Sequence, residues 1–548
     1  MRIQRRFAQM VLTVVLSGIC VFSSAQQPSG QAGRHPTSET QLVEVPQLDV
    51  NKGVQLGLSD VVSLTLANNP NIQISRLAVS ISVDDVERAK GIYDPVFRAL
   101  VQRDNSEKPT GFSPSAISSA GAAGDSTAAS FGFSLDEAQI TETTLAQVGI
   151  TQLLPLGTQL EVKFIHRRLD YEDSRRSSPI YINPAHFAEA VVSLRQPLLK
   201  NFGWFVTNAG ISIARRNREI SEQDLRGQII SQLSQVARTY WDLAFAIENY
   251  KARLVSLRLA EDLYRVNEAR YRAGVRPITD VLQARAEVAS RESAVIAAYQ
   301  TIENLQDALI QQMHLGHVDK SRWQTPIFPS DAPTSQPISL DDEAFIAEAL
   351  QKRPEFNKAL TALDIARIQE RVARNQRLPE LNAFGSYGFL GDGAEEDGAW
   401  DDVEDHRWQE WAVGMEFIYA IPNRKARAEY RQSQRRREQS ELSRDALEEL
   451  IIQDVRRSTR AVRNALVQIG VSESRLKFED EKLRSQEKRY EVGLATAFEL
   501  LDFQEDYTEA QVALYRSLSE YEKAKIDLAV ARGTVLEVMG VEIRPSSN

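Results

Sequence analysis

The chain carries one turn motif twice, first as Tyr271-Arg-Ala-Gly274-Val-Arg-Pro-Ile-Thr-Asp280-Val-Leu282 and again as Tyr490-Glu-Val-Gly493-Leu-Ala-Thr-Ala-Phe-Glu499-Leu-Leu501. The two copies keep a constant offset in the numbering (490 − 271 = 219). Each copy lies between two long segments of helical periodicity, and glycine is the residue that a helix C-terminus needs in order to turn with positive φ. The motif therefore predicts two antiparallel pairs of helices, each joined by a tight tip.

A second repeat precedes each tip. Pro70 and Pro95 recur as Pro354 and Pro379, and the two offsets are identical (354 − 70 = 379 − 95 = 284). Proline ends or begins a helix because it lacks the amide donor, so short helices are predicted over 56–94 and 339–378. Their predicted N-caps are Ser59 and Ser339. Internal duplication explains the spacing.

The N-terminus has the pattern of a targeting segment. Basic residues precede an apolar run over 10–22, and small residues up to Ala25 would allow cleavage, so 1–25 is a predicted signal peptide. The run is short for a membrane anchor. Residues 26–55 are polar and are predicted to form a flexible tail. Cys20 lacks the small preceding residue that lipoprotein acylation needs, so we expect no acylation and a mature chain without a thiol.

Charge and hydropathy restrict the class of protein. The 548 residues carry a formal net charge of −10 with a pI near 5.4, which argues against a nucleic-acid partner. After residue 25 no apolar run reaches the ~18 residues of a membrane helix. An exported chain of this kind is periplasmic, secreted, or an outer-membrane β-barrel.

Beyond Pro95 and Pro379 the periodicity changes from helix to strand, over 95–197 and 379–421. In the second segment Trp411, Val413, Met415 and Phe417 share one face. Strands of ~9–11 residues with one apolar face are typical of membrane barrels, although soluble sandwiches also alternate. The first segment supplies four strands and the second two. The sequence leaves open whether the additional hairpin, near 145–167, joins a barrel.

The connecting segment 391–407 is rich in acidic residues. Its spacing fits no EF-hand calcium loop, so we predict a solvated extracellular loop.

Long helices follow each β segment, roughly over 205–271 and 423–490. At ~1.5 Å per residue a helix of ~67 residues is about 100 Å long, whereas a bilayer core is ~30 Å thick. Such a rod must stand in water. Small and apolar residues spaced alternately by four and three predict a coiled-coil seam: Ala510, Leu514, Ser517, Tyr521, Ala524, Leu528, Ala531 and Val535. The helical regions are 198–316 and 422–541, with a Pro-rich linker over 317–338 and a tail over 542–548.

In this order of elements the chain resembles the TolC-type outer-membrane efflux proteins over residues 56–541. Local sequence motifs support the resemblance: Ser193-Leu-Arg-Gln-Pro197, Tyr240-Trp-Asp-Leu243 and the two Tyr-x-x-Gly tips. The resemblance implies a mainly α fold with a β-barrel portion, in which three copies share one outer-membrane barrel and one periplasmic α-barrel. It implies a passive exit duct for efflux or type I secretion, surrounded by outer-membrane lipid and docked to a periplasmic adaptor and an inner-membrane pump.

Two sites follow from the resemblance by matching position. Glu499 and Asp502 match the acidic pair that lines the family's periplasmic aperture, and Asp280 is the first-half counterpart of Glu499. The expected adaptor-docking tips comprise Tyr271, Gly274, Tyr490, Val492, Gly493 and Leu494. A basic residue that helps to close the aperture in the family is replaced here by Ala495, with Arg276 in the matching first-half place. An acid near a helix N-terminus is also favoured by the macrodipole alone.

The sequence offers no catalytic or cofactor signature. It lacks a Ser-His-Asp arrangement, a phosphate-binding Gly loop and an HExxH motif, and its histidines show no known metal spacing. We therefore expect no enzyme activity, cofactor or metal. The alternative class is a periplasmic or surface coiled-coil scaffold with a soluble sheet, which salt alone would extract from membranes.

Overall fold

The computed structural model describes residues 46, 48, 53–109, 138–172 and 183–542, all of which fall within the unit that begins at Pro46. The predictions for the signal peptide over 1–25, for Cys20, and for most of the N-terminal and C-terminal tails lie outside the described residues.

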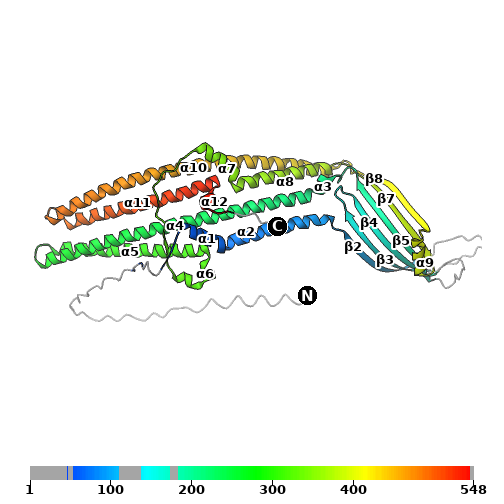
Figure 1. The fold of residues 1–548 in the computed structure, drawn as a ribbon, viewed down its shortest axis with the longest axis horizontal. Coiled ribbons are helices and arrows are strands. Elements are labelled where there is room, and N and C mark those ends of the chain that lie inside the picture. Colours follow the sequence, from blue (N-terminus) through cyan, green and yellow to red (C-terminus); the bar gives the residue numbers. More distant parts are fainter. Residues whose placement is uncertain (1–45, 47, 49–52, 110–137, 173–182, 543–548) are drawn as a thin grey trace, which may run out of the picture. The chain divides into compact units, whose positions relative to one another are not determined.

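The helices confirm the internal duplication. The first half contains α1 (Leu58–Asn68), α2 (Pro70–Lys90), α4 (Ala209–Arg272) and α5 (Ile278–Met313). Their second-half counterparts are α7 (Asp342–Lys352), α8 (Pro354–Gln376), α10 (Arg424–Glu491) and α11 (Ala497–Arg532). Short helices are α3 (Trp204–Thr207), α6 (Leu315–Val318) and α12 (Val535–Val538). Helix α4 lies along α5 and α10 along α11, with both tips at the end remote from the sheet (Figure 1).

The predicted N-caps of α1 and α7 were wrong. Helix α1 is capped at Gly57, whose N–H donates to Asp60 Oδ2 at 3.1 Å, and Ser59 lies inside the helix. Helix α7 is capped by Asp341, whose carboxylate accepts from the N–H groups of Glu343 and Ala344 at 3.1 Å. Asp341 takes the role predicted for Ser339, whereas Asp60 accepts the N–H of the cap residue itself; a carboxylate in either place also complements the helix dipole.

The predicted seam forms the core between α10 and α11. Ile451, Val455, Val462 and Ile469 are buried on α10, facing Tyr521, Ala524, Leu528 and Ala531 on α11. Ser517 is also buried, and its hydroxyl is 2.9 Å from that of Ser472. Val535 instead joins a second cluster with Val62, Ile72 and Leu233. None of the described helices combines the length and apolarity that crossing a membrane requires.

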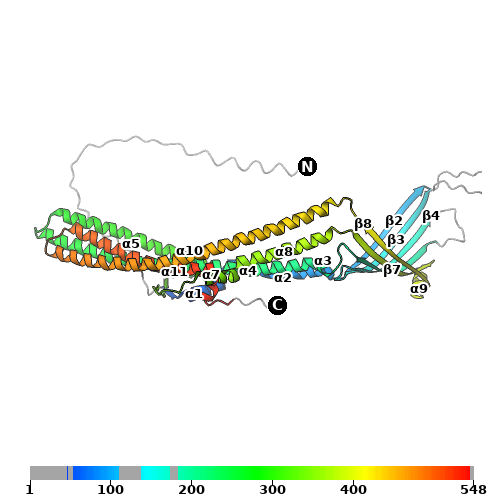
Figure 2. The same ribbon diagram turned by 90° about the horizontal axis from the view of Figure 1, so that it is seen from above.

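Within the described residues six strands form one antiparallel sheet, in the order β2-β3-β4-β5-β7-β8. They are β2 (Val96–Pro109), β3 (Ala138–Leu153), β4 (Gln159–Glu172), β5 (Ala185–Pro197), β7 (Glu380–Gly393) and β8 (Trp408–Ile418). The additional hairpin is β3–β4, and it lies within the sheet between β2 and β5. In each repeat the chain thus leaves α2 or α8, runs through the strands of the sheet and returns into α4 or α10 (Figure 2).

The two faces of the sheet differ in polarity, as the alternation predicts. Direct pairing sets one row of apolar residues across all six strands: Phe97, Ile150, Val162, Val192, Tyr387 and Trp411. On this apolar face Val101 and Val413 are both 78% exposed. The opposite face carries ion pairs, between Lys163 and Glu161 at 3.4 Å and between Arg195 and Glu416. An apolar face that stays largely exposed is not typical of one half of a soluble sandwich.

The acidic segment 391–407, predicted as a loop, contains the helix α9 (Glu396–Glu404). Ala399 and Val403, one turn apart, are buried against Ala188 and Phe389 on the apolar face. A Cβ at Gly391 would approach the carbonyl oxygen of Ala399 to 1.9 Å, so the glycine lets the helix approach the strand. Because charged residues surround these two apolar residues in the sequence, the helix was not predicted.

The Pro-rich linker is held against the long helices by tyrosine hydroxyls. A parallel pair, β1 (Val54–Leu56) and β6 (Ile327–Pro329), joins the middle of the linker to the N-terminal segment. The Tyr240 hydroxyl lies 2.9 Å from Asp331 Oδ2, which also accepts from the N–H of Leu58 at 2.7 Å. On the other repeat, the Tyr521 hydroxyl donates to the carbonyl of Gln336 at 2.6 Å.

Tyr240 should make the stability of this region sensitive to alkaline pH. Burial raises the pKa of Tyr240 from 10.0 to about 12. Because the folded-state pKa is the higher one, this stabilisation is complete below pH 10 and is lost as the pH rises through about 12. For a change of two pKa units this stabilisation amounts to about 3 kcal/mol. Tyr240→Phe should lower the free energy of unfolding by about 1–2 kcal/mol at pH 8, because it removes the hydrogen bonds. The melting temperature of this variant should also depend less on pH between pH 9 and 12 than that of the wild type.

The matched control is Tyr264→Phe on the same helix. Tyr264 is partly exposed, and its hydroxyl makes no hydrogen bond with a described residue. This variant should keep the wild-type pH profile. An unchanged alkaline loss in Tyr240→Phe would show that another group is responsible.

Candidate functional site at the helix tips

Both tips have the same backbone geometry. Gly274 and Gly493 have φ of +76° and +80°, as the duplicated motif predicts. In the first tip the N–H groups of Gly274 and Val275 donate to the carbonyls of Tyr271 and Arg270, both at 2.9 Å. The equivalent bonds of the second tip measure 3.1 and 2.8 Å. These are the two bonds of the Schellman motif, which satisfies the last carbonyls of a helix and reverses the chain.

The helices that leave the tips begin differently. In the second half Thr496 caps α11, accepting from the N–H of Glu499 at 3.2 Å, while Glu499 Oε2 accepts from the N–H of Thr496 at 2.9 Å. This is a capping box. In the first half the cap is Pro277, which has no side-chain hydrogen bond. Glu499 is therefore a structural cap as well as a candidate aperture residue.

The three predicted aperture acids have different surroundings. Glu499 and Asp502 are exposed and stand on the same face of α11, one turn apart. Asp502 has no hydrogen bond or ion pair with any described residue. Asp280 is only partly exposed and lies 3.6 Å from Arg276 of its own tip. The second tip thus carries uncompensated negative charge, whereas the first tip balances its acid locally.

The duplicated tyrosines also have different surroundings. Tyr271 is 41% exposed, while Tyr490 is only 5% exposed. The Tyr490 hydroxyl donates to Oδ1 of the fully buried Asn267 at 2.6 Å, which ties the end of α10 to α4. Arg270 and Arg276 place their guanidinium carbons 5.2 and 5.8 Å from the centre of its ring. Tyr490 therefore links the two tips, and Arg276 contributes to that link from the first half.

A buried cation lies further along the helices. Arg291 of α5 donates to Glu287 at 2.8 Å and to the carbonyls of Ser256 on α4 and Leu501 on α11, at 2.9 and 3.1 Å. Its side chain is 4% exposed. Arg291 occupies a seam position, three residues after Val288 and four before Val295. A basic residue in step with the seam was the sequence signal that could have revealed it.

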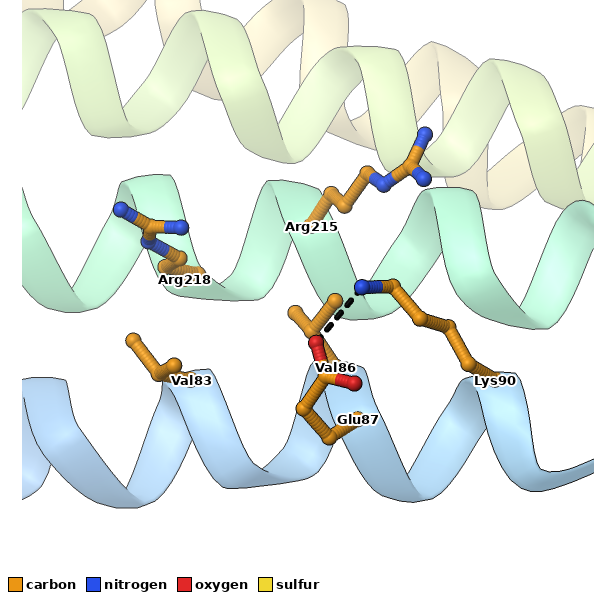
Figure 3. A pocket seen from close by; sticks show the side chains of 6 residues that line it. All are labelled: Val83, Val86, Glu87, Lys90, Arg215 and Arg218. Carbon is orange, nitrogen blue, oxygen red and sulfur yellow. Dashed lines mark hydrogen bonds and ion pairs between the residues drawn. The ribbon is translucent and has the colours of Figure 1, made fainter. Parts of the chain in front are cut away.

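Other hollows do not resemble a catalytic site. One of about 360 Å³ lies between α2 and α4 and is lined by Val83, Val86, Glu87, Lys90, Arg215 and Arg218 (Figure 3). Its charges are those of helix surfaces, such as the pair between Lys90 and Glu87 at 2.6 Å. Among the described residues, no group of three or more His, Cys, Asp or Glu side chains is placed to hold a metal ion.

Comparison with known proteins decides the family. The family model described as outer membrane efflux protein matches residues 170–313 and 345–534, which is more than half of the chain. The chain belongs to the outer membrane efflux protein family. The matched ranges include both long helix pairs and both tips.

Known relatives of this efflux protein agree with that assignment. The alkaline protease secretion protein AprF of Pseudomonas aeruginosa is 22% identical over 351 residues, which cover 62% of this chain and 67% of AprF. The CmeC outer membrane channel of Campylobacter jejuni superposes with a TM-score of 0.62 at 15% identity, covering 95% of this chain and 94% of CmeC. The MtrE outer membrane channel of Neisseria gonorrhoeae, in its open state, gives 0.59 at 15% identity, covering 94% and 98%.

The tips of this efflux protein also carry an apolar surface that the sequence prediction included only in part. Val492 and Leu494 are exposed, as a docking surface requires. Four further exposed apolar residues surround them or occupy the first tip: Val275, Ile278, Leu282 and Phe498. Isolated exposed apolar residues are ordinary, but several gathered at two adjacent tips indicate a contact surface.

Proposed function

We propose that three copies of this outer membrane efflux protein form one passive exit duct of a tripartite efflux or secretion system. The observation that carries the proposal is the sheet, in which β2 and β8 each have an edge that pairs with no other described strand, and one face is apolar and largely exposed. In a bilayer every backbone group needs a partner, so such a sheet is stable only when its edges close into a barrel. Further copies of the chain supply the missing edges.

The helices support the same assembly. Each rod buries a narrow seam against its partner, and exposed apolar residues such as Leu442, Val467 and Phe478 remain along α10. A ring of such rods around an aqueous lumen would continue the barrel into the periplasm. AprF is named as a secretion protein and CmeC and MtrE as outer membrane channels. The duct needs no chemistry of its own, because an inner-membrane pump reached through a periplasmic adaptor would supply the energy.

The aperture of this duct would lie at the tips. Three copies of Glu499 and Asp502 would form two acidic rings that favour cations over anions. Asp280 would contribute less, because Arg276 neutralises it within the chain. The contact of Tyr490 with Asn267, together with Arg276, would hold the two tips of one chain together in the closed state. These contacts would take over the closing role of the family's basic residue, whose position is occupied here by Ala495.

The adaptor would bind the exposed apolar residues of both tips. We expect Val275→Asp combined with Leu494→Asp to reduce crosslinking to a co-expressed periplasmic adaptor by at least tenfold. The reason is that burying each of these side chains contributes on the order of 1.5–3 kcal/mol, and a buried unpaired carboxylate is costly. Gly274 and Gly493 would set the angle at which this surface is presented.

The control for that experiment is Asn464→Asp, which places the same charge at an exposed polar position on α10, remote from the tip. It should leave crosslinking intact. Equal losses in the tip and control variants would indicate general damage to the assembly instead of a docking surface.

The trimer itself is tested by fractionation and conductance. Heat-modifiable trimers should appear in outer-membrane fractions, resist extraction by salt, and conduct ions in planar bilayers. Extraction by salt alone would favour the coiled-coil scaffold. A stably folded, detergent-free monomer would contradict the duct.

A further inference from the structure

The two halves of the chain differ in length between the short helices and the tips. Upstream of the strands, equivalent elements of the two halves differ by 284 in residue number, as at the starts of α1 and α7 (342 − 58 = 284). At the tips the difference is only 219, as at the starts of α5 and α11 (497 − 278 = 219). The first half is therefore the longer one (284 − 219 = 65), and its extra strands β3 and β4 lie between these points. The hairpin is an addition to the repeat.

The added hairpin is built into the sheet along its full length. β3 pairs with β2 from Val96–Thr151 to Pro109–Ala138, and β4 pairs with β5 from Gln159–Arg195 to Leu169–Ala185. Its exposed apolar residues, such as Val148, Ile150 and Phe164, are on the same face as those of the other strands. Arg167 of β4 lies 4.0 Å from Glu189 of β5 on the polar face. The hairpin is thus a continuous part of the wall.

We propose that the β3–β4 hairpin widens the outer-membrane pore, because three copies close a barrel of 18 strands (3 × 6) where the unextended repeat would close one of 12 (3 × 4). This inference rests on the proposed trimer. It concerns a different feature, the number of strands that each copy contributes.

The edges of the sheet are suited to this closure. β2 runs away from the helices and β8 runs back toward them, so β8 of one copy meets β2 of the next in antiparallel orientation. Exposed apolar residues of both edge strands, Val101 and Val413, belong to the same face, so the outer surface continues across the junction. Helix α9 packs on β5 and β7, away from the edge strands β2 and β8.

Circumference favours the larger barrel. Helices α2, α4, α8 and α10 of each copy pack in that order next to the sheet (Figure 1), which makes 12 helices in three copies (3 × 4). At ~8–10 Å between axes they need about 96–120 Å of circumference. Strands ~4.8 Å apart and tilted by ~40° occupy ~6.3 Å each, so 18 strands span about 113 Å and 12 strands about 75 Å. The circumference of the wider barrel therefore matches that of the helical ring.

The consequence is a wide exit. A circumference of about 113 Å corresponds to about 36 Å between opposite backbones, in the range of barrels that leave an open aqueous channel. An α-helical segment of polypeptide, ~10–12 Å across, would pass this section without contact with the wall. Selection of cargo by size would then take place at the tips, and the cargo class extends to polypeptides.

Disulfide crosslinking tests the strand order in the assembled trimer. The sequence has a single cysteine, Cys20 in the predicted signal peptide, so introduced pairs are the only candidates in a mature chain. The pairs Ala99→Cys with Val148→Cys, and Val162→Cys with Val192→Cys, join β2 to β3 and β4 to β5 at directly opposed positions. Both should crosslink within one chain. Val101→Cys, scanned against cysteines at 411, 413 and 415 on β8, should give covalent trimers.

The competing arrangement pairs β2 directly with β5 and leaves the hairpin outside the wall. It predicts a crosslink within one chain between Ala99→Cys or Val101→Cys and Val192→Cys, and that result would overturn the inference while leaving the duct intact. Absence of trimers in every variant and in the wild type would overturn both. Cryo-electron microscopy of the wild-type trimer gives a readout independent of cysteines. Eighteen strands and a backbone diameter about 1.5-fold that of a 12-stranded barrel are expected, and 12 strands would refute the proposal.

Discussion

Replacing Arg291 by alanine should loosen the tip end of the helices more than any other single change in this region. The guanidinium holds α4, α5 and α11 together through Ser256, Glu287 and Leu501. Breaking a buried charged contact by removing one partner costs about 3–5 kcal/mol. Because Glu287 remains about one-third exposed, about 2–4 kcal/mol is expected here.

Hydrogen exchange of the detergent-solubilised trimer provides the measurement. Backbone amides at the start of α11 should lose about a hundredfold in protection, since about 1.4 kcal/mol corresponds to a factor of ten. The control is Arg285→Ala, an exposed arginine of the same helix without an ion pair to any described residue. It should change protection by less than about twofold. Equal exchange in the two variants would mean that Arg291 does not hold the three helices together.

Arg291 also marks the limit of what periodicity predicts. The seam positions on α11 followed from a spacing of four and three. The structure confirms them except for Val535, because apolar burial along a rod depends on local periodicity. A charged residue in the same register is interpreted as an interruption of the seam. Its acceptors on Ser256 and Leu501 are 35 and 210 residues away, and no local pattern predicts them.

The tips show the same division between local and distant information. Gly274 and Gly493 were predictable because a positive φ is a property of the residue itself. The different environments of Tyr271 and Tyr490 were not, although the motif around them is duplicated. Only Tyr490 meets a buried asparagine from the other half, 223 residues away.

The sheet illustrates a third case. Alternation predicted which residues share a face, since side chains in a strand point alternately to opposite sides. It left the hairpin β3–β4 unplaced, because pairing between strands depends on contacts that alternation does not encode. Helix α9 was missed for a simpler reason. Its buried residues are Ala399 and Val403, with Trp400 packed beside them, in a segment otherwise dominated by acids and glycine.

Neutralising the acids of the second tip should have the largest effect on transport. In Glu499→Gln combined with Asp502→Asn, a trimer would lose six negative charges (3 × 2) from its aperture. One unit charge ~6 Å from an ion contributes about 0.7 kcal/mol in water, so a ring of three contributes about 2 kcal/mol. The ratio of cation to anion permeability, measured from reversal potentials across a KCl gradient near 0.1 M, should fall by about tenfold. Glutamine can still accept the N–H of Thr496, so the capping box keeps a hydrogen-bond acceptor.

The matched variant is Asp280→Asn in the first tip, where Arg276 already compensates the acid. Removing that carboxylate exposes a positive charge instead of deleting an uncompensated negative one. We therefore expect it to lower cation preference by no more than about twofold. At ~1 M salt, where screening acts within ~3 Å, the difference between the two variants should largely disappear. Undiminished selectivity in the double variant at low salt would place the selective constriction elsewhere in the duct.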